Sequence, residues 1–131
     1  MNAKKRPKRK DSNVGHVRII AGKWRGRKLF LAPSDKLRPT PDRVRETVFN
    51  WLSPYLVGAS CLDLFAGTGA LGFEALSRGA QQSVLVENDQ PTADLLQHHV
   101  TALGASNAVI FNVDAAAWVR HTAPTAFDIV F

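Results

Sequence analysis

The sequence predicts an α/β fold, a Rossmann-like doubly wound parallel sheet that is incomplete at about four strands, preceded by a basic β-hairpin and a helix. From residue 59 onward, short apolar runs alternate with amphipathic segments of helical length, which favours parallel strands joined by right-handed crossovers. A glycine-rich turn follows the first of these runs, where open α/β sheets bind ligands. Two short runs upstream flank a basic, glycine-containing segment that is typical of a hairpin. The chain therefore divides into a tail (1–15), a hairpin plus helix (16–58) and a sheet domain (59–131).

The N-terminal part is predicted to hold a tail, a hairpin and a connector. Residues 1–15 contain few apolar side chains, so we expect a disordered basic tail. Strands over 17–20 and 28–31 form the hairpin and expose Trp24, which either stacks on a ligand or packs against the hairpin itself. A Pro-containing connector over 32–39 then leads to the helix.

That helix is predicted to begin with Thr40 as N-cap and Pro41 at the first helical position, and to end at Pro54. Its spacing places several apolar residues on one face, which we expect to be buried: Val44, Val48, Trp51 and Leu52.

The sheet domain is predicted from the same periodicities. Strands are expected at 61–65, 83–87, 109–113 and 127–131, and helices at 70–78, 91–103 and 115–121. A glycine-rich turn over 66–72 links the first strand to its helix. Cys61 and Trp118 are expected to pack inside this domain.

Charge is distributed unevenly along the chain. Residues 1–45 hold 15 Lys+Arg and 3 Asp+Glu, a balance of +12, whereas residues 46–131 hold 2 and 8, a balance of −6, which together give the net charge of +6. A basic arm on a mildly acidic body indicates contact with a polyanion. Basic residues that only aid solubility are the alternative.

Length and composition restrict the class of protein further. The chain has 131 residues, 45% apolar and 21% charged, which suits one globular domain. No apolar run approaches the roughly 18 residues of a membrane helix, and no apolar core follows the basic N-terminus as in a secretory signal. The single cysteine excludes an internal disulfide, and the four histidines show no metal-ligand spacing with it. We expect a cytoplasmic monomer that binds neither metal nor membrane.

Three successive predicted strands each end in a carboxylate: Asp63, Glu87 and Asp114. The carboxyl ends of parallel strands meet at one edge of a sheet, so these side chains should share a rim. There Glu87 can accept hydrogen bonds from both hydroxyls of a ribose, and Asp114 can reach an adenine edge. The spacing indicates an adenosine-containing cofactor. Alternatively, Asp63 and Asp114 cap helices and Glu87 is a solvated loop residue.

The glycines 67, 69 and 72 also match the G-x-G-x-x-G dinucleotide fingerprint, which alone is weak evidence. Asp63 discriminates between a dinucleotide such as NAD and S-adenosylmethionine. An acid is repelled by the pyrophosphate of NAD and attracted by the sulfonium and ammonium of S-adenosylmethionine. Asp63 therefore favours S-adenosylmethionine over NAD. An NAD-binding oxidoreductase and an RNA-binding module without catalysis are kept as alternatives.

The first motif of class I S-adenosylmethionine-dependent methyltransferases is similar to the segment D-L-F-A-G-T-G at 63–69. The signature of the RsmD-type 16S rRNA (guanine-N2)-methyltransferases resembles R-I-I-A-G-K-W-R-G-R-K-L at 18–29 and L-R-P-T-P-D-R-V-R-E-T-V-F-N-W-L at 37–52. This resemblance implies methyl transfer from S-adenosylmethionine to the exocyclic N2 of a guanine in small-subunit (16S) ribosomal RNA. The implied partner is that RNA or an assembling small ribosomal subunit.

The resemblance also implies roles for individual residues. Glu87 would hold the ribose and Asp114 the adenine, while the methionine part would lie against Asp63 and the backbone of Phe65, Ala66, Gly67, Thr68 and Gly69. The hairpin residues that would contact RNA are Arg18, Lys23, Trp24, Arg25, Arg27 and Lys28. Near the mouth of the site would lie Arg38, Thr40 and Arg43. Arg43 and Arg45 could instead be solvated and pair with Glu46.

The catalytic motif that the resemblance implies does not occur in the sequence. In the family, the fourth strand leads into Asp/Asn-Pro-Pro-Phe/Tyr, which orients the target amine and stacks an aromatic ring on the flipped base. Here the strand F-D-I-V-F ends at Phe131, so no catalytic residue is assigned. We expect a truncated chain that is catalytically inactive and poorly folded.

Overall fold

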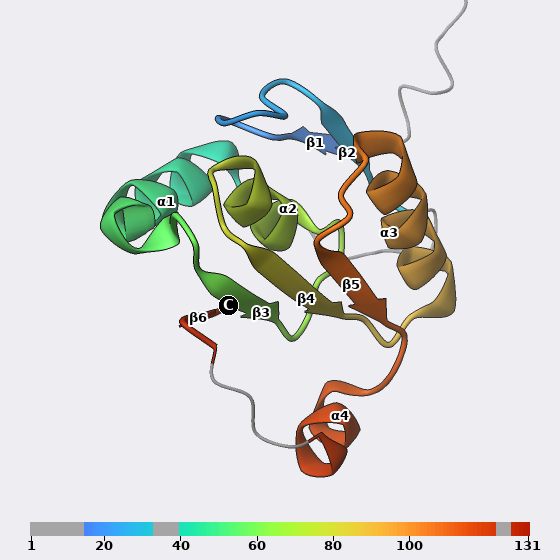
Figure 1. Ribbon diagram of the computed structural model, residues 1–131. Helices are drawn as coiled ribbons and strands as arrows, with labels where there is room; N and C mark the ends of the chain where they lie inside the picture. Colours follow the sequence, from blue (N-terminus) through green and yellow to red (C-terminus); the bar gives the residue numbers. More distant parts are fainter. Residues whose placement is uncertain (1–14, 33–39, 123–126) are drawn as a thin grey trace, which may run out of the picture.

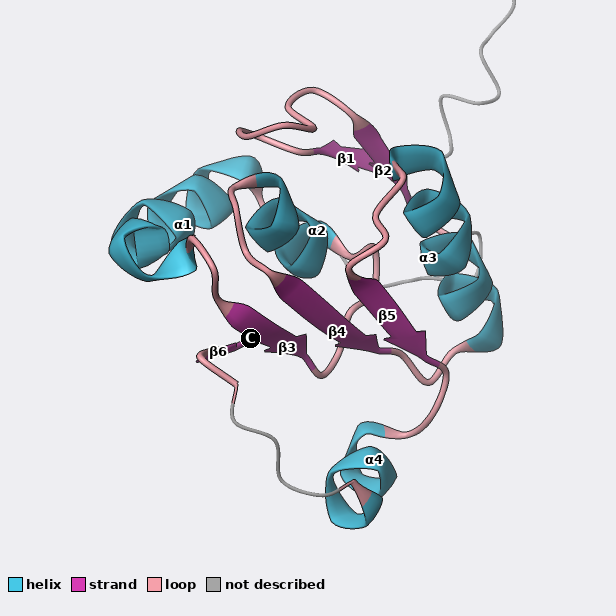
Figure 2. Cartoon of the chain, in the orientation of Figure 1, coloured by secondary structure: helices cyan, strands magenta, loops and turns pink. Residues whose placement is uncertain are grey.

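The computed structural model describes residues 15–32, 40–122 and 127–131. In chain order its elements are β1 (His16–Arg18), β2 (Lys28–Phe30), α1 (Asp42–Leu56), β3 (Ser60–Asp63), α2 (Ala70–Ser77), β4 (Gln82–Val86), α3 (Gln90–Leu103), β5 (Ala108–Phe111), α4 (Ala115–His121) and β6 (Ile129–Val130) (Figure 1; Figure 2). Residues 1–14 of the predicted tail and 33–39 of the predicted connector lie outside the described residues. None of the described helices has the length and apolar character needed to cross a membrane.

The sheet contains four parallel strands in the order β5-β4-β3-β6. Asp63 in β3 is in register with Leu85 in β4, and Leu62 is in register with Val130 in β6. Helices α1, α2 and α3 lie on one side of the sheet and α4 on the other (Figure 1). The predicted Rossmann-like α/β fold is confirmed, with the expected hairpin and helix before it.

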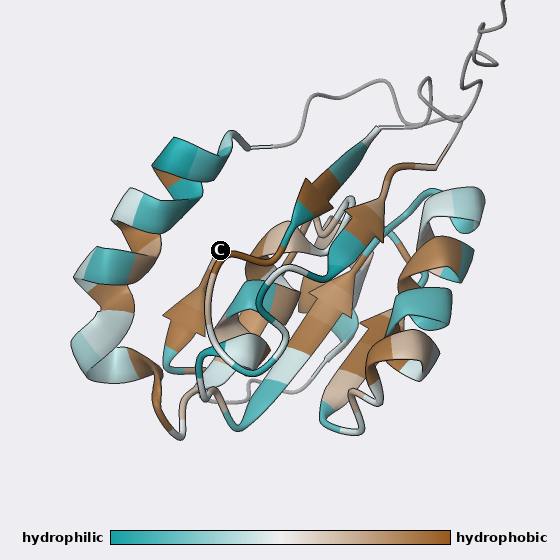
Figure 3. Ribbon diagram, turned by 90° about the horizontal axis from the view of Figure 1, so that it is seen from above, coloured by the Kyte–Doolittle hydropathy of each residue, from teal (hydrophilic) through white to brown (hydrophobic). Residues whose placement is uncertain are grey.

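The sheet separates two groups of buried side chains, because neighbouring residues of a strand point to opposite faces. Cys61 belongs to the larger cluster, which α1, α2 and α3 cover, whereas Leu62 belongs to the smaller one next to α4. Figure 3 shows the parallel strands hydrophobic along most of their length, beside helices of mixed character. The predicted packing of Cys61 and Trp118 is confirmed, since the Trp118 ring contacts the rings of Phe111 and Phe127.

Helix α1 differs from its prediction at both ends. It begins at Asp42 with Pro41 as N-cap, and it continues through Pro54 to Leu56. The predicted stop at Pro54 is wrong, because the proline lies in the last turn, where its missing N–H removes a single helical hydrogen bond.

The buried face of α1 also differs from the predicted one. It consists of Arg45, Phe49 and Leu56, while Trp51 is 73% exposed and Val44 is 47% exposed. The apolar pattern predicted a face that contained Trp51. The observed face includes a charged residue, because α2 supplies a carboxylate that pairs with Arg45 inside the protein.

The hairpin is confirmed as two antiparallel strands, with Val17 opposite Leu29. These two side chains are buried, and the basic residues beside them face outward. The predicted exposure of Trp24 is wrong: its side chain is buried, and its backbone N–H donates to Ser77 Oγ of α2 at 2.9 Å. The hairpin therefore rests on the outer side of α2 (Figure 1).

Candidate functional site

The turn between β3 and α2 is shaped by two glycines with positive φ. Gly67 has φ of 55° and Gly69 has φ of 83°, a region that non-glycine residues rarely occupy. A Cβ on Gly69 would also lie 2.5 Å from the ring of Phe73, so no larger residue fits there. Thr68 Oγ1 accepts a hydrogen bond from the N–H of Ala70 at 3.2 Å and closes the turn onto α2. The turn thus presents backbone at the carboxyl end of β3.

The third glycine of the motif has a packing role. A Cβ on Gly72 would lie 2.9 Å from a methyl carbon of Leu85, so the glycine lets α2 approach β4 closely. Ser83 Oγ donates to the carbonyl of Gly72 at 2.9 Å and holds the same contact. This close approach fixes the start of α2, and with it the turn, against the sheet.

Asp63 ends β3 and is buried at 3% exposure. Its Oδ2 finds no hydrogen-bond partner among the described residues. Burial raises the pKa of Asp63 from its ordinary 3.8 to about 6; hydrogen bonds from the backbone of Phe65 and Gly72 act to lower the pKa, and the nearby Glu87 carboxylate acts to raise it. A buried carboxylate with one unpartnered oxygen is a favourable site for a cationic group.

Glu87 lies at the same rim, directly after β4. Its Oε1 accepts a hydrogen bond from the N–H of Gly67 at 2.9 Å, and its Oε2 accepts one from the N–H of Asp89 at 3.0 Å. A carboxylate can accept about four hydrogen bonds, so these contacts orient Glu87 and leave it further acceptor capacity. Glu87 therefore joins the glycine turn to the neighbouring strand.

The third predicted carboxylate, Asp114, follows β5 and forms the N-cap of α4. Its Oδ2 accepts a hydrogen bond from the N–H of Ala117 at 3.0 Å, and the residue is exposed. The capping role that was the alternative is therefore observed, and contact with an adenine stays a prediction. Asp63 is the last residue of β3, and Glu87 and Asp114 follow the adjacent strands β4 and β5, so all three lie at the carboxyl edge of the sheet.

Sequence reasoning missed Asn112, which also lies at this edge. Its Nδ2 donates to the carbonyls of Glu87 at 2.9 Å and Asn88 at 3.1 Å, tying the end of β5 to the loop after β4. The predicted strand at 109–113 included Asn112, whereas the observed β5 ends at Phe111 and leaves Asn112 at the rim. Phe65 is a second feature of this rim, because its side chain is 80% exposed within a turn whose neighbouring residues are mostly buried.

The basic residues predicted to contact RNA lie on the surface of the hairpin. The exposed ones are Arg18, Lys23, Arg25, Arg27 and Lys28. Arg27 Nη2 donates to the carbonyl of Ala102 in α3 at 3.0 Å, so part of its bonding capacity is already used. Lys23 Nζ lies 4.8 Å from the ring centroid of Trp24. Trp24 itself is buried and does not present its ring as an exposed stacking surface.

Of the residues predicted at the mouth of the site, Arg38 lies outside the described residues, Arg43 is exposed and Thr40 is partly exposed. The local pairing of Arg45 with Glu46 is wrong, because Arg45 bonds to Asp42 and Glu74. Within the described part of the chain, no group of three or more His, Cys, Asp and Glu side chains could hold a metal ion.

The strand order, the glycine turn and the acidic rim define a Rossmann-like α/β protein, and methyltransferases are among the solved structures similar to it. One similar solved structure is the Trypanosoma brucei PRMT1 enzyme-prozyme complex with AdoHcy, at TM-score 0.57 and 25% identity, matching 68% of this chain and 28% of that one. The chain belongs to the family described as conserved hypothetical protein 95, whose model matches residues 17–131. The RsmD-type family that the sequence motifs indicated is thereby confirmed.

Relatives at higher identity come from bacteria. Ribosomal RNA small subunit methyltransferase D of Escherichia coli (strain K12) is 50% identical over 120 residues, which are 92% of this chain and 60% of that protein. The protein of the same name from Haemophilus influenzae is 48% identical over 89% of this chain and 62% of its own length. The solved structure of yhhF from Escherichia coli has TM-score 0.81 and 50% identity, over 89% of this chain and 64% of that chain. The chain thus spans about three fifths of the length of these curated relatives.

Proposed function

We propose that this chain is the cofactor-binding and RNA-binding part of an S-adenosylmethionine-dependent methyltransferase. The substrate is the exocyclic N2 of a guanine in 16S ribosomal RNA, as bare RNA or in an assembling small subunit. The protein acts as a monomer in the cytoplasm, where ribosomal subunits assemble. The observation that carries this proposal is the buried carboxylate of Asp63, whose Oδ2 has no partner among the described residues, beside a glycine turn at the sheet edge.

The residues of this rim fit S-adenosylmethionine, which supplies an activated methyl group. Asp63 would accept hydrogen bonds from its ammonium group and offset its positive charge. Glu87, held by the N–H of Gly67, would accept hydrogen bonds from the ribose hydroxyls, and Asp114 would reach the adenine. An NAD pyrophosphate would place two negative charges near Asp63, so the rim disfavours the nicotinamide alternative.

The outward basic residues of the hairpin suit a polyanionic substrate. The five exposed basic side chains of the hairpin would contact RNA phosphates. Such contacts position the RNA without reading its sequence. The target guanine must then reach the carboxyl edge of the sheet, where the exposed Phe65 and the glycine turn lie. The Asp/Asn-Pro-Pro-Phe/Tyr motif expected to orient the target amine does not occur in the 131 residues, so no residue named here is given that role.

Calorimetric titration of the chain with S-adenosylhomocysteine tests the cofactor assignment. We expect saturable binding that is weakened in both Asp63→Ala and Glu87→Ala, with NADH giving no heat of binding. Unchanged affinity in both variants, or saturable binding of NADH, would refute the assignment.

Binding of a fluorescein-labelled single-stranded oligoribonucleotide tests the RNA assignment. The logarithm of its affinity should fall linearly with the logarithm of salt concentration, with a slope of about −0.7 for each phosphate contacted. Binding that is insensitive to salt would contradict the role given to the hairpin cations.

A further inference from the structure

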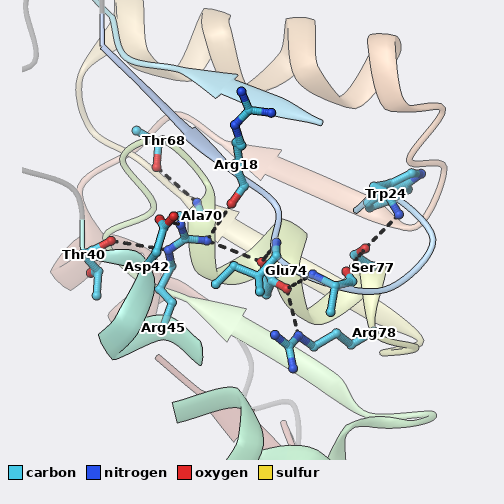
Figure 4. A network of polar contacts seen from close by, with 12 residues as sticks. Arg18, Trp24, Thr40, Asp42, Arg45, Thr68, Ala70, Glu74, Ser77 and Arg78 are labelled. Carbon is cyan, nitrogen blue, oxygen red and sulfur yellow. Dashed lines mark hydrogen bonds and ion pairs between the residues drawn. The ribbon is translucent and has the colours of Figure 1, made fainter. Parts of the chain in front are cut away.

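Two side chains of α2, Glu74 and Ser77, bond to the backbone of the basic hairpin. Glu74 accepts hydrogen bonds from the backbone N–H of Ile20 through Oε1 at 2.9 Å and of Ala21 through Oε2 at 3.1 Å. Ser77 Oγ accepts from the N–H of Trp24 and donates to the carbonyl of Ala21 at 2.7 Å (Figure 4). The segment that joins the two strands is therefore bonded to a helix more than fifty residues further along the chain.

Arg45 of α1 completes this attachment. Its Nη1 donates to the carbonyl of Arg18 in β1 at 3.0 Å and lies 3.4 Å from Glu74 Oε1. Its Nη2 pairs with the Asp42 carboxylate, and its Nε donates to the carbonyl of Thr40 at 3.4 Å. One guanidinium thus contacts the hairpin, α2 and the start of α1 at the same time (Figure 4).

Both charged groups of this pair are fully buried, at 0% exposure each. Removing two charges from water is unfavourable, and well-packed apolar residues of similar volume often give equal or greater stability. The distinctive property of the pair is its geometry, because a planar guanidinium and a carboxylate direct several hydrogen bonds that an apolar pair cannot make. The ion pair therefore differs from an apolar pair in fixing the position of the hairpin backbone that it bonds to.

We propose that Arg45 and Glu74 are positioning residues, whose buried ion pair holds the basic hairpin on α2 and so determines the affinity for RNA while leaving the affinity for cofactor unchanged. This inference rests on the proposed RNA-binding function of the hairpin. The contacts that shape the cofactor rim do not involve the pair, since Gly67 bonds to Glu87 and the N–H of Ala66 bonds to the carbonyl of Val86.

The test replaces the pair by apolar residues of similar size, Arg45→Met together with Glu74→Leu. The double variant also removes the carboxylate that accepts hydrogen bonds from the amides of Ile20 and Ala21 and pairs with Arg78 at 2.8 Å, so thermal unfolding should stay cooperative with a lowered midpoint. The Kd for S-adenosylhomocysteine should stay within about twofold. The Kd for a labelled single-stranded oligoribonucleotide should rise about tenfold or more, the equivalent of about 1.4 kcal/mol. Arg45→Lys, which keeps the charge and loses the planar fork, should also weaken RNA binding.

Arg120→Met is the matched control, because it removes one cation from the exposed end of α4, on the other side of the sheet from the hairpin. Arg120→Met should alter RNA affinity less than Arg45→Lys does. Arg120→Met lowers the net charge by one, whereas Arg45→Lys leaves the net charge unchanged. A larger effect of the control would show that total charge sets RNA affinity and would overturn the proposal.

The remaining outcomes separate this inference from the proposed function. Equal RNA affinity of the parent and double-variant chains, or a parallel loss of RNA and cofactor affinity, would overturn the inference. If the parent chain binds no RNA, the proposed RNA function fails, and hydrogen exchange at the amides of Ile20 and Ala21 still tests positioning. Those amides should exchange faster in the double variant, and unchanged protection would refute the positioning role.

Discussion

Replacing Asp63 with Asn should stabilise the folded chain and weaken its binding of a cationic cofactor. The pKa of Asp63 is 3.8 ordinarily and about 6 in the folded protein, chiefly because the carboxyl group is buried. An acid with a raised folded pKa favours folding most when it is protonated, so its contribution to stability is largest below pH 3.8 and is lost as pH rises through about 6. At about 1.4 kcal/mol per pKa unit, this difference amounts to about 3 kcal/mol.

We therefore expect the Asn variant at pH 7 to have an unfolding free energy up to about 3 kcal/mol above that of the parent chain. The advantage should decrease as pH falls through about 6 and vanish only below pH 3.8, where Asp63 is protonated in both states. Urea unfolding followed by tryptophan fluorescence between these pH values measures the difference directly.

Calorimetry with S-adenosylhomocysteine supplies the second half of this test. The Asn variant should bind about tenfold or more weakly at pH 7, since a hydrogen bond to a charged group contributes roughly 1.5–3 kcal/mol. The parent's affinity should rise with pH through about 6, as Asp63 ionises. Asp128→Asn is the control, because this exposed carboxylate lies before β6, at the amino edge of the sheet. A pH-independent loss of stability, or unchanged cofactor affinity, in Asp63→Asn would refute the reasoning.

Three further predictions concern the hairpin and the core. Gly22→Ala should detach the hairpin and reduce RNA affinity, because its Cβ would lie 1.9 Å from the carbonyl oxygen of Ser77. Gly26→Ala has a similar φ and open space around its Cβ, so it controls for backbone strain alone; equal urea unfolding midpoints for the two variants would contradict this account. Burial lowers the pKa of His99, whose Nε2 accepts a hydrogen bond from the N–H of Phe30, so neutral His99 should support the hairpin above pH 6.5 and lose this effect as pH falls. If the protection of the Phe30 amide, taken relative to its intrinsic exchange rate at each pH, does not fall in acid, the prediction is wrong. Burial raises the pKa of Cys61 to about 11, so a thiol reagent at pH 8 should label it only upon unfolding, and rapid labelling of the folded chain would show that the core is open.

Much of the fold could be predicted because its determinants are local. The alternation of apolar runs with amphipathic segments indicated the order of strands and helices, since each element must bury its own apolar side chains. The carboxylates after successive strands could be assigned to one rim because parallel strands end at the same edge of a sheet. The position of Asp63 was therefore predictable, whereas its raised pKa depends on how completely the turn and α2 exclude water.

The environment of individual side chains was not predictable in the same way. Trp24 was expected to be exposed and is buried, because α2 supplies the surface beneath it. Trp51 was expected in the core and is exposed, because the buried face of α1 is rotated toward Arg45. Hydrophobicity within one segment contains no information about a partner that lies far along the chain.

The sequence by itself determined the α/β class, the glycine turn, the acidic rim and the basic hairpin, because each depends on residue types at short separations. Only the tertiary structure decided which charges are internal. Glu74 lies 29 residues from Arg45 and 54 from Ile20, yet it bonds to both. A buried charge is tolerated only where its partners converge in space, and that convergence arises when the hairpin, α1 and α2 pack together.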